Sequence, residues 1–160
     1  MNSLSNRQGS KTAQRTGGTA RGAVAQHVRR MSAEKLDGVF AAVGQGLRDG
    51  MSREAERLLL KTIEGYTHPP DIFAHLKRLL SFTLETLGRY KESLDVLSPF
   101  EDEGTLSLLE PATQIHVTTQ LAIGYSNLSD QPKAVTLLKE THKKAQESEL
   151  ARLSGPIYVA

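Results

Sequence analysis

Histidine is the residue type in this chain with the widest chemical use, because imidazole binds metals and transfers protons near neutral pH. No two histidines lie three or four residues apart, which is the spacing that brings two ligands to one face of a helix. The HExxH pattern of zinc enzymes is also absent. The sequence therefore predicts neither a metal site nor a catalytic residue among the histidines, which we expect at the surface or in a groove. The five are His27, His68, His75, His116 and His142.

Other kinds of catalytic chemistry also lack a sequence signature. The segment Thr16-Gly17-Gly18-Thr19 lacks the GxxxxGK[ST] frame of a phosphate-binding loop and follows no predicted strand. The serines have no nucleophile-elbow context. The absence of cysteine excludes thiol catalysis, zinc knuckles and a disulfide framework. We therefore expect a protein that is not an enzyme and that has no cofactor.

Charge divides the chain into two unequal parts. Residues 1–33 hold six basic residues and no acidic one, which leaves 14 basic and 18 acidic residues in 34–160. The polar, Gly-rich composition of residues 1–31 predicts a disordered basic tail, whose end, Ala23–Met31, has the spacing of a short helix. Three roles stay open for this tail: a solvated tail, an organellar transit peptide, or an arm that contacts nucleic acid or acidic lipid.

The composition also limits the compartment and the partners. No stretch reaches the roughly 18 to 20 apolar residues that a membrane-spanning helix needs. The lack of cysteine favours a reducing compartment, so we expect a cytoplasmic protein, or an organellar-matrix protein if the tail is a transit peptide. No aromatic residue is interleaved with the basic residues of the tail, which argues against nucleic acid as the main partner.

Beyond residue 31, apolar residues recur at helical spacing between capping residues, glycines and prolines. The expected helices run from a cap at Ser32 to Asp49-Gly50, from a cap at Ser52 to His68-Pro69-Pro70, from a cap near Asp71 to Gly88, from Tyr90 to Pro99, from Pro111 to Leu128, and from Asp130-Gln131-Pro132 to about Leu153. We expect a loose acidic stretch at 101–105, a short apolar turn at 106–109, and the start of a further, truncated helix at 154–160. No segment alternates with period two, so no sheet is predicted.

One phrase occurs three times: a helix ends at a small residue, and a second helix has a small residue five positions later. The three occurrences are Gly50 with Ala55, Gly88 with Ser93, and Ser129 with Ala134, at intervals of 38 and 41 residues. Small residues allow two helices to cross closely while the neighbouring leucines fill the groove. The repeat predicts an all-α domain over residues 32–153, made of three antiparallel helix pairs.

These pairs resemble tetratricopeptide repeats. The third pair carries the resemblance best, and the first is weaker because Ala42, Val43 and Gly46 stand where larger residues are common. The matching residues are Leu121-Ala122, Tyr125, Ser129, Ala134 and Leu138; Leu80-Ser81, Leu84, Gly88, Tyr90, Ser93 and Leu97; and Gly50, Ala55 and Leu59. The chain departs from the family in having no Trp and in exceeding the usual period of about 34 residues, which is similar to long-helix variants of the family. The resemblance implies a right-handed superhelical array, or α-solenoid.

In this family the first helix of each pair lines a concave groove that binds partners. The resemblance therefore implies that candidate partner contacts lie in the first helices of the second and third pairs. They are His75, Arg78, Phe82, Glu85, His116, Thr119, Gln120, Ile123, Ser126 and Asn127. Arg78 and Gln120 suit an acidic or amide-rich peptide, because they supply charge-assisted and neutral hydrogen bonds.

The leading hypothesis from the sequence is a protein–protein interaction module, the N-terminal part of a larger protein, which presents a groove to a peptide or a partner helix. One alternative is a nucleic-acid-associated regulator whose basic tail contacts phosphates. Another is a self-associating scaffold, because an array that ends in an incomplete repeat has an uncapped C-terminal end through which copies can pair.

Overall fold

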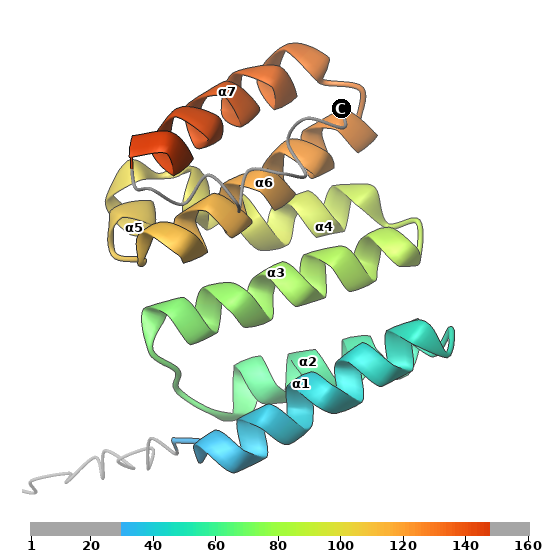
Figure 1. The fold of residues 1–160 in the computed structure, drawn as a ribbon. Helices are drawn as coiled ribbons and strands as arrows, with labels where there is room; N and C mark the ends of the chain where they lie inside the picture. Colours follow the sequence, from blue (N-terminus) through green and yellow to red (C-terminus); the bar gives the residue numbers. More distant parts are fainter. Residues whose placement is uncertain (1–29, 148–160) are drawn as a thin grey trace, which may run out of the picture.

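The computed structural model describes residues 30–147, and most of them are helical (Figure 1). Within this range the helices are α1 (Ala33–Arg48), α2 (Ser52–Gly65), α3 (Pro70–Thr86), α4 (Tyr90–Leu97), the 3-10 helix η1 (Ser98–Glu101), α5 (Glu103–Ser107), α6 (Pro111–Asn127) and α7 (Gln131–Glu147). The same range contains no strand, only an isolated bridge between Arg30 and Thr67. The all-α prediction is confirmed.

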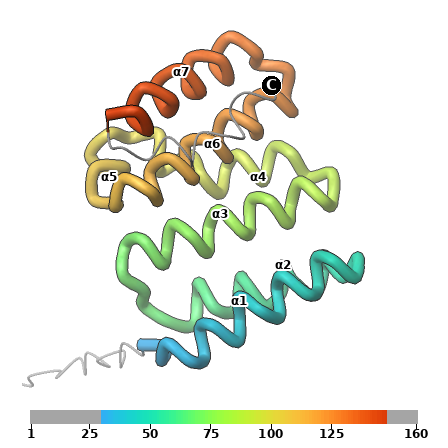
Figure 2. Tube along the Cα trace, viewed as in Figure 1, coloured from blue at the N-terminus to red at the C-terminus, as the bar shows by residue number. Residues whose placement is uncertain are grey.

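Six of the described helices pack as antiparallel pairs in chain order: α1 with α2, α3 with α4, and α6 with α7. In Figures 1 and 2, α1, α3 and α6 lie on the near side of the molecule, and α2 and α4 lie behind them. Each pair also packs against the one before it, through α2 with α3 and through α6 with both α3 and α4. The predicted order of helix pairs is confirmed, whereas the right-handed superhelix stays a prediction.

The three repeated turns share one backbone conformation. Gly50, Gly88 and Ser129 have positive φ angles of 75°, 73° and 65°. After each of them, a backbone N–H donates to the carbonyl five residues earlier: Met51 to Gly46 at 2.7 Å, Arg89 to Leu84 at 2.9 Å, and Asp130 to Tyr125 at 2.9 Å. This is the Schellman arrangement, which satisfies the last carbonyls of a helix. The repeated phrase in the sequence is thus a repeated structure.

The small residues of the phrase lie where two helices cross. Ala55, Ser93 and Ala134 are only 3%, 0% and 2% exposed. In the first pair, a Cβ added at Gly46 would lie 3.8 Å from the Cβ of Ala55, so α1 and α2 are in close contact there. The glycine that departs from the family pattern at position 46 therefore serves the crossing itself.

Two of the predicted helix caps are wrong. Ser32 does cap α1, because its side chain accepts the N–H of Lys35. At α2, however, Met51 is the N-cap, and the Ser52 hydroxyl lies 2.9 Å from Oγ1 of Thr86 on α3. At α3 the helix begins at Pro70, and the carboxylate of Asp71 accepts the N–H of Glu110 at 2.9 Å. Both side chains form hydrogen bonds outside their own helix instead of capping it.

The segment between α4 and α6 is more ordered than predicted. It holds η1 and α5, and Asp102 caps α5 by accepting the N–H of Thr105 at 2.7 Å. Phe100 in η1 is 4% exposed, so burial of its ring anchors the segment against the body. Because α4 has only eight residues, the 41-residue interval contains a short helix and an added segment instead of a long second helix.

The core consists of two clusters of buried residues, and α3 contributes to both. The first cluster lies between α1, α2 and α3 and comprises Val39, Val43, Ala55, Leu59, Leu76, Leu80 and Leu84. The second joins α3 to α4, η1 and α6 and comprises Ala74, Leu97, Phe100, Leu109, Val117 and Leu121. Because α3 is packed on both sides, its remaining surface is held rigidly.

Some predictions lie outside the described residues. They concern the basic tail up to residue 29, the last helix beyond Glu147, and the truncated helix at 154–160. Between residues 30 and 147, no helix combines the length and the apolar character that crossing a bilayer requires.

Candidate partner-binding face

Three basic side chains meet where α3 lies beside α6. His75 and Arg78 are one turn apart on α3, and His116 has the same position on α6 that His75 has on α3, 13 residues before the turn residue of its pair. Nη2 of Arg78 lies 3.5 Å from Nδ1 of His75. The charge of Arg78 acts on both imidazoles. The structure thus brings together three predicted site residues, termed the basic cluster below.

The pKa values of both histidines of the basic cluster are lowered, which favours their neutral forms at pH 7. Burial lowers the pKa of His75 from its ordinary value of 6.5, and the charges of Arg78 and His116 lower it further. Burial and the charge of Arg78 also lower the pKa of His116.

The ring of Phe40 on α1 makes a T-shaped contact with the ring of His75, with centroids 4.9 Å apart. Phe40 therefore belongs to the site, although the sequence analysis did not select it.

Arg78 is a half-buried cation without an acidic partner among residues 30–147. Its Nε is enclosed and has no hydrogen-bond partner in that range. Burial lowers its pKa, yet a guanidinium remains charged at neutral pH. Buried charges are ordinarily paired, because losing their hydration is costly. Arg78 can therefore accept an anion from outside this part of the chain.

Glu85 lies two turns from Arg78 on α3 and belongs to a separate polar network. Ser93 on α4 donates to Oε1 of Glu85 at 3.1 Å, and the hydroxyls of Ser81 and Ser93 are 2.8 Å apart. Burial raises the pKa of Glu85, and the nearby Ser93 hydroxyl and Gln120 amide counter part of that shift. Gln120 is 6% exposed, and its Nε2 lies near Glu85 without a hydrogen bond of normal geometry. Gln120 is thus a buried residue between helices, not the surface contact that we predicted.

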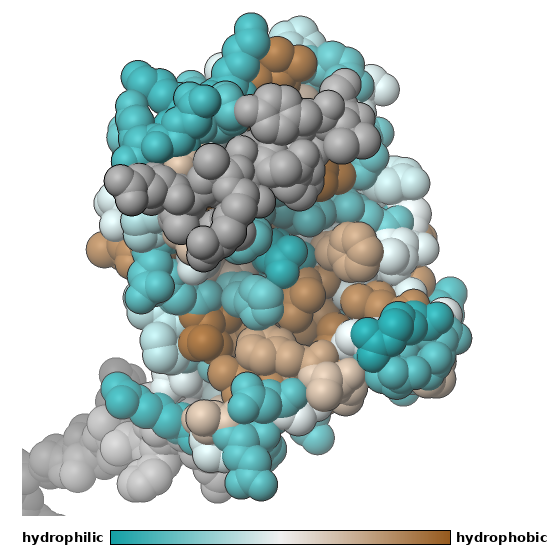
Figure 3. Space-filling model, in the orientation of Figure 1, coloured by the Kyte–Doolittle hydropathy of each residue, from teal (hydrophilic) through white to brown (hydrophobic). Residues whose placement is uncertain are grey.

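Two exposed apolar side chains lie one turn beyond the basic cluster. Phe82 on α3 is 44% exposed and Ile123 on α6 is 41% exposed, and both lie six residues before the turn residue of their pair. The corresponding residue of α1 is Gly44, where an added Cβ would meet only the side chain of Arg48. Figure 3 shows hydrophobic surface over the middle of this side, where α1 and α3 lie in Figure 1. We define the α3–α6 face as the basic cluster together with Phe82 and Ile123.

The remaining predicted contacts are less involved in this face. The hydroxyl of Thr119 donates to the carbonyl of Ile115 on its own helix at 2.7 Å. Ser126 forms a hydrogen bond with Gln131 at the turn into α7. Asn127 is exposed at the end of α6, three turns beyond His116. These three residues do not extend the basic cluster.

A polar cluster that the sequence analysis missed joins η1 to the last helix pair. The hydroxyl of Tyr125 donates to Oε1 of Glu101 at 2.5 Å, and Nζ of Lys133 donates to Oε2 of Glu101 at 2.7 Å and to the Tyr125 oxygen. The ammonium also lies 4.0 Å from the centroid of the Tyr125 ring. Each of these groups is satisfied by the other two, so the cluster fixes η1 in place.

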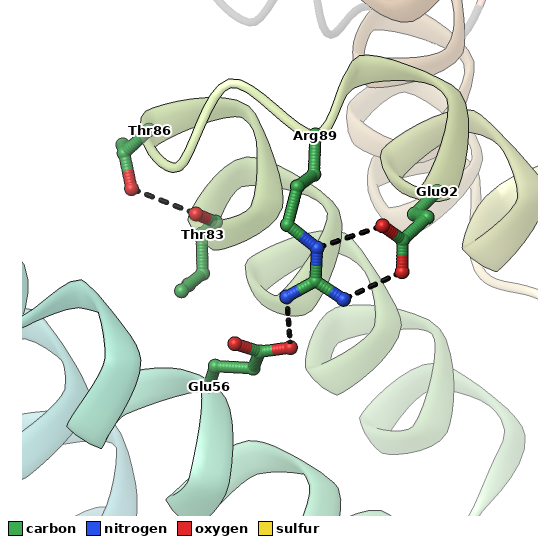
Figure 4. Close-up of polar contacts among 5 residues, drawn as sticks. All are labelled: Glu56, Thr83, Thr86, Arg89 and Glu92. Carbon is green, nitrogen blue, oxygen red and sulfur yellow. Dashed lines mark hydrogen bonds and ion pairs between the residues drawn. The ribbon is translucent and has the colours of Figure 1, made fainter.

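A second polar cluster ties the first pair to the second. Arg89, just before α4, donates from Nη1 to Glu56 on α2 at 2.6 Å, and from Nε and Nη2 to Glu92 at 2.8 and 2.5 Å (Figure 4). At the nearby end of α3, the hydroxyl of Thr86 lies 2.7 Å from the carbonyl oxygen of Thr83. Unlike Arg78, Arg89 has all its charge compensated by carboxylates of this chain, which makes it a structural residue.

A cavity of about 600 Å³ lies between η1, α5, α6 and α7. Its apolar lining includes Phe100, Leu106, Leu121 and Leu137. None of the predicted site residues lines it.

Within residues 30–147, no group of three or more His, Asp or Glu residues could hold a metal ion. Comparison with protein-family models, with curated proteins and with solved structures gives no match. The tetratricopeptide resemblance consequently depends on this chain's own residues, and a function must be argued from the geometry of the α3–α6 face.

Proposed function

We propose that this chain is a non-enzymatic interaction module that binds a segment of a partner protein on the α3–α6 face. The observation that carries the proposal is the half-buried Arg78, whose guanidinium has no acidic partner among the described residues. A partner that supplies an anion would compensate this charge. The ligand expected is therefore a segment of negative character.

The surroundings of Arg78 support a protein partner over a free small anion. Phe82 is one helical turn from Arg78, and Ile123 has the equivalent position on α6. Arg and aromatic residues are enriched where protein interfaces bind most strongly, and exposed apolar side chains beside a charged one supply the hydrophobic part of such a contact. A segment with an acidic group and an apolar side chain close to it would match both features.

The scaffold suits this role because it holds the face in place before a partner binds. The α3 helix is packed between two core clusters, and α6 packs against both α3 and α4. A rigid face loses little conformational entropy on binding. We include the tetratricopeptide-like solenoid in the proposal: α1, α3 and α6 share one side of the molecule, as the groove-lining helices of such an array would.

Affinity capture from a native lysate tests the proposal, with the wild-type chain compared with Arg78→Glu and Phe82→Ala. Matched controls are Arg57→Glu, whose side chain is 75% exposed on α2, and Leu108→Ala, which is 69% exposed beyond α5. We expect both face variants to lose a partner that both controls retain. Equal recovery by all five proteins would overturn the proposal, and recovery of the same chain alone would indicate self-association.

A further inference from the structure

We infer that the anion accepted by the basic cluster is a phosphoryl group on the partner, so that phosphorylation switches binding on. This inference depends on the proposed function of the α3–α6 face, and it adds the chemical identity of the ligand group. Three properties of the basic cluster support the inference: the number of its hydrogen-bond donors, the positive charge it holds when its histidines are protonated, and the partial burial of its side chains.

The donors outnumber what a carboxylate can use. The guanidinium of Arg78 can by itself bind both oxygens of a carboxylate, through two parallel N–H bonds in one plane. Here two imidazoles accompany it, one from each helix, and Nδ1 of His75 lies 3.5 Å from Nη2 of Arg78. A phosphoryl group has three terminal oxygens that point in different directions. Donors from two neighbouring helices, α3 and α6, can approach such a group from more than one side.

The charge of the cluster can rise to meet a dianion. Arg78 carries the fixed positive charge of the cluster, and the lowered pKa values of His75 and His116 favour their neutral forms at pH 7. A phosphate monoester carries a charge of roughly −1.5 to −2 at that pH. Such a group beside the imidazoles favours their protonated forms, which then become cationic donors. A single carboxylate is already neutralised by Arg78 and gains less from the histidines.

The enclosure of the cluster strengthens these contacts. His75 and Arg78 are half-buried whereas His116 is exposed, and the ring of Phe40 makes a T-shaped contact with that of His75. Hydrogen bonds between charged groups are stronger where water is partly excluded. The nearest carboxylate of the predicted site is that of Glu85, which lies two turns away and is bonded to Ser93, so it does not compete for Arg78.

The apolar residues place a second requirement on the ligand. Phe82 lies four residues after Arg78, a rise of about 6 Å along the helix. An extended peptide covers that distance in about two residues. The expected ligand is therefore an extended segment with a phosphorylated residue and, about two positions away, a large apolar residue.

The direct experiment titrates the folded protein with N-acetyl-phosphoserine methylamide and, separately, with N-acetyl-aspartate methylamide, while NMR follows the imidazole signals of His75 and His116. We expect the phosphoserine compound to raise both imidazole pKa values and to bind roughly tenfold more tightly than the aspartate compound. Arg78→Gln should lose this response, and Arg57→Gln should keep it. Equal affinity for the two compounds, or unmoved imidazole signals, would overturn the inference.

A second experiment separates the inference from the proposed function, and its phosphatase comparison uses the wild-type chain. The lysate used for affinity capture is divided, and one half is treated with a phosphatase before the wild-type chain is added. We expect the partner that depends on Arg78 to disappear from the treated half. If that partner is recovered equally from both halves, the interaction module stands and the phosphoryl inference is wrong. If no partner depends on Arg78 in either half, the proposed function fails as well.

Discussion

Ser129 adopts the same left-handed backbone conformation as Gly88, at the corresponding end of the next helix pair. Their φ angles are 65° and 73°, and both turns are closed by the same pair of backbone hydrogen bonds. For glycine this conformation has no steric cost, whereas a side chain brings Cβ close to the backbone. The third turn is therefore strained in a way that the first two are not.

Ser129→Gly should stabilise the protein by about 0.5–1 kcal/mol, because it removes that strain at a helix C-terminus. Gly88→Ala should destabilise it by about 1 kcal/mol or more. A Cβ at Gly88 would meet no atom within 4 Å, so the whole effect belongs to the backbone. Urea denaturation measures both changes. Gly65→Ala at the end of α2 is the control, since it is not in a left-handed conformation, and a loss of stability there as large as that of Gly88→Ala would contradict the argument.

Gly124 sets the distance between α6 and α4. A Cβ at this position would lie 3.2 Å from Cδ1 of Leu94 and 3.9 Å from its Cα. Alanine gains helix propensity but must displace the end of a flexible side chain, so we expect Gly124→Ala to be nearly neutral. Gly124→Leu should cost about 1–3 kcal/mol through overpacking.

The control for this series is Gly38, a residue of α1 where an added Cβ would meet nothing within 4 Å. Gly38→Ala should stabilise the protein by about 0.5–1 kcal/mol. Thermal denaturation of the three variants gives the order. If Gly124→Leu were as stable as the wild type, the close approach of α6 to α4 would be wrong.

The buried hydroxyls of Ser81 and Ser93 should show energetic coupling. Ser93→Ala removes the hydroxyl that contacts the buried Ser81 and the half-buried Glu85, and we expect it to cost about 1–3 kcal/mol. The double variant with Ser81→Ala should cost less than the sum of the two single variants, because both hydroxyls are then absent. Ser93→Ala should also raise the pKa of Glu85, since Ser93 holds it down. Ser98→Ala, at an exposed hydroxyl, should change stability by less than about 0.5 kcal/mol. Additive single effects would contradict the coupling.

The sequence predicts the fold well where the signal is local. The apolar spacing and the three turn residues place α1, α3 and α6 to within a residue or two, because helix periodicity and left-handed turns depend on neighbours in the chain. Ser52 and Asp71 were assigned as caps by the same local logic. The Ser52 hydroxyl and the Asp71 carboxylate instead form hydrogen bonds outside their own helices. Those contacts depend on how the helices pack, which no local sequence pattern contains.

The candidate site also combines features that the local sequence predicts with features that depend on tertiary packing. His75 and His116 are equivalent in the repeat, so their meeting around Arg78 follows from the register of the predicted helix pairs. Gln120 was assigned to the partner-binding groove from its place in the repeat, but the structure buries it between helices near Glu85. The sequence analysis did not select Phe40, because its contact with His75 depends on how the first two pairs pack together.

The folding stability should fall as the pH decreases through the titration of His75 and His116. Both histidines have pKa values below 6.5 in the folded protein, because burial and the charge of Arg78 disfavour the imidazolium. In the unfolded chain they titrate near that ordinary value, so on acidification the unfolded state binds protons first. Their contribution is therefore complete above about pH 6.5 and is lost as the pH falls from there to the folded-state pKa values.

Urea denaturation between pH 8 and pH 5 measures how the free energy of unfolding changes with pH, and NMR titration of the imidazoles assigns that change to His75 and His116. Arg78→Gln should raise both pKa values and flatten the slope, whereas Arg57→Gln should leave it unchanged. Imidazoles that titrate at or above 6.5 in the folded wild type would show that Arg78 does not face them.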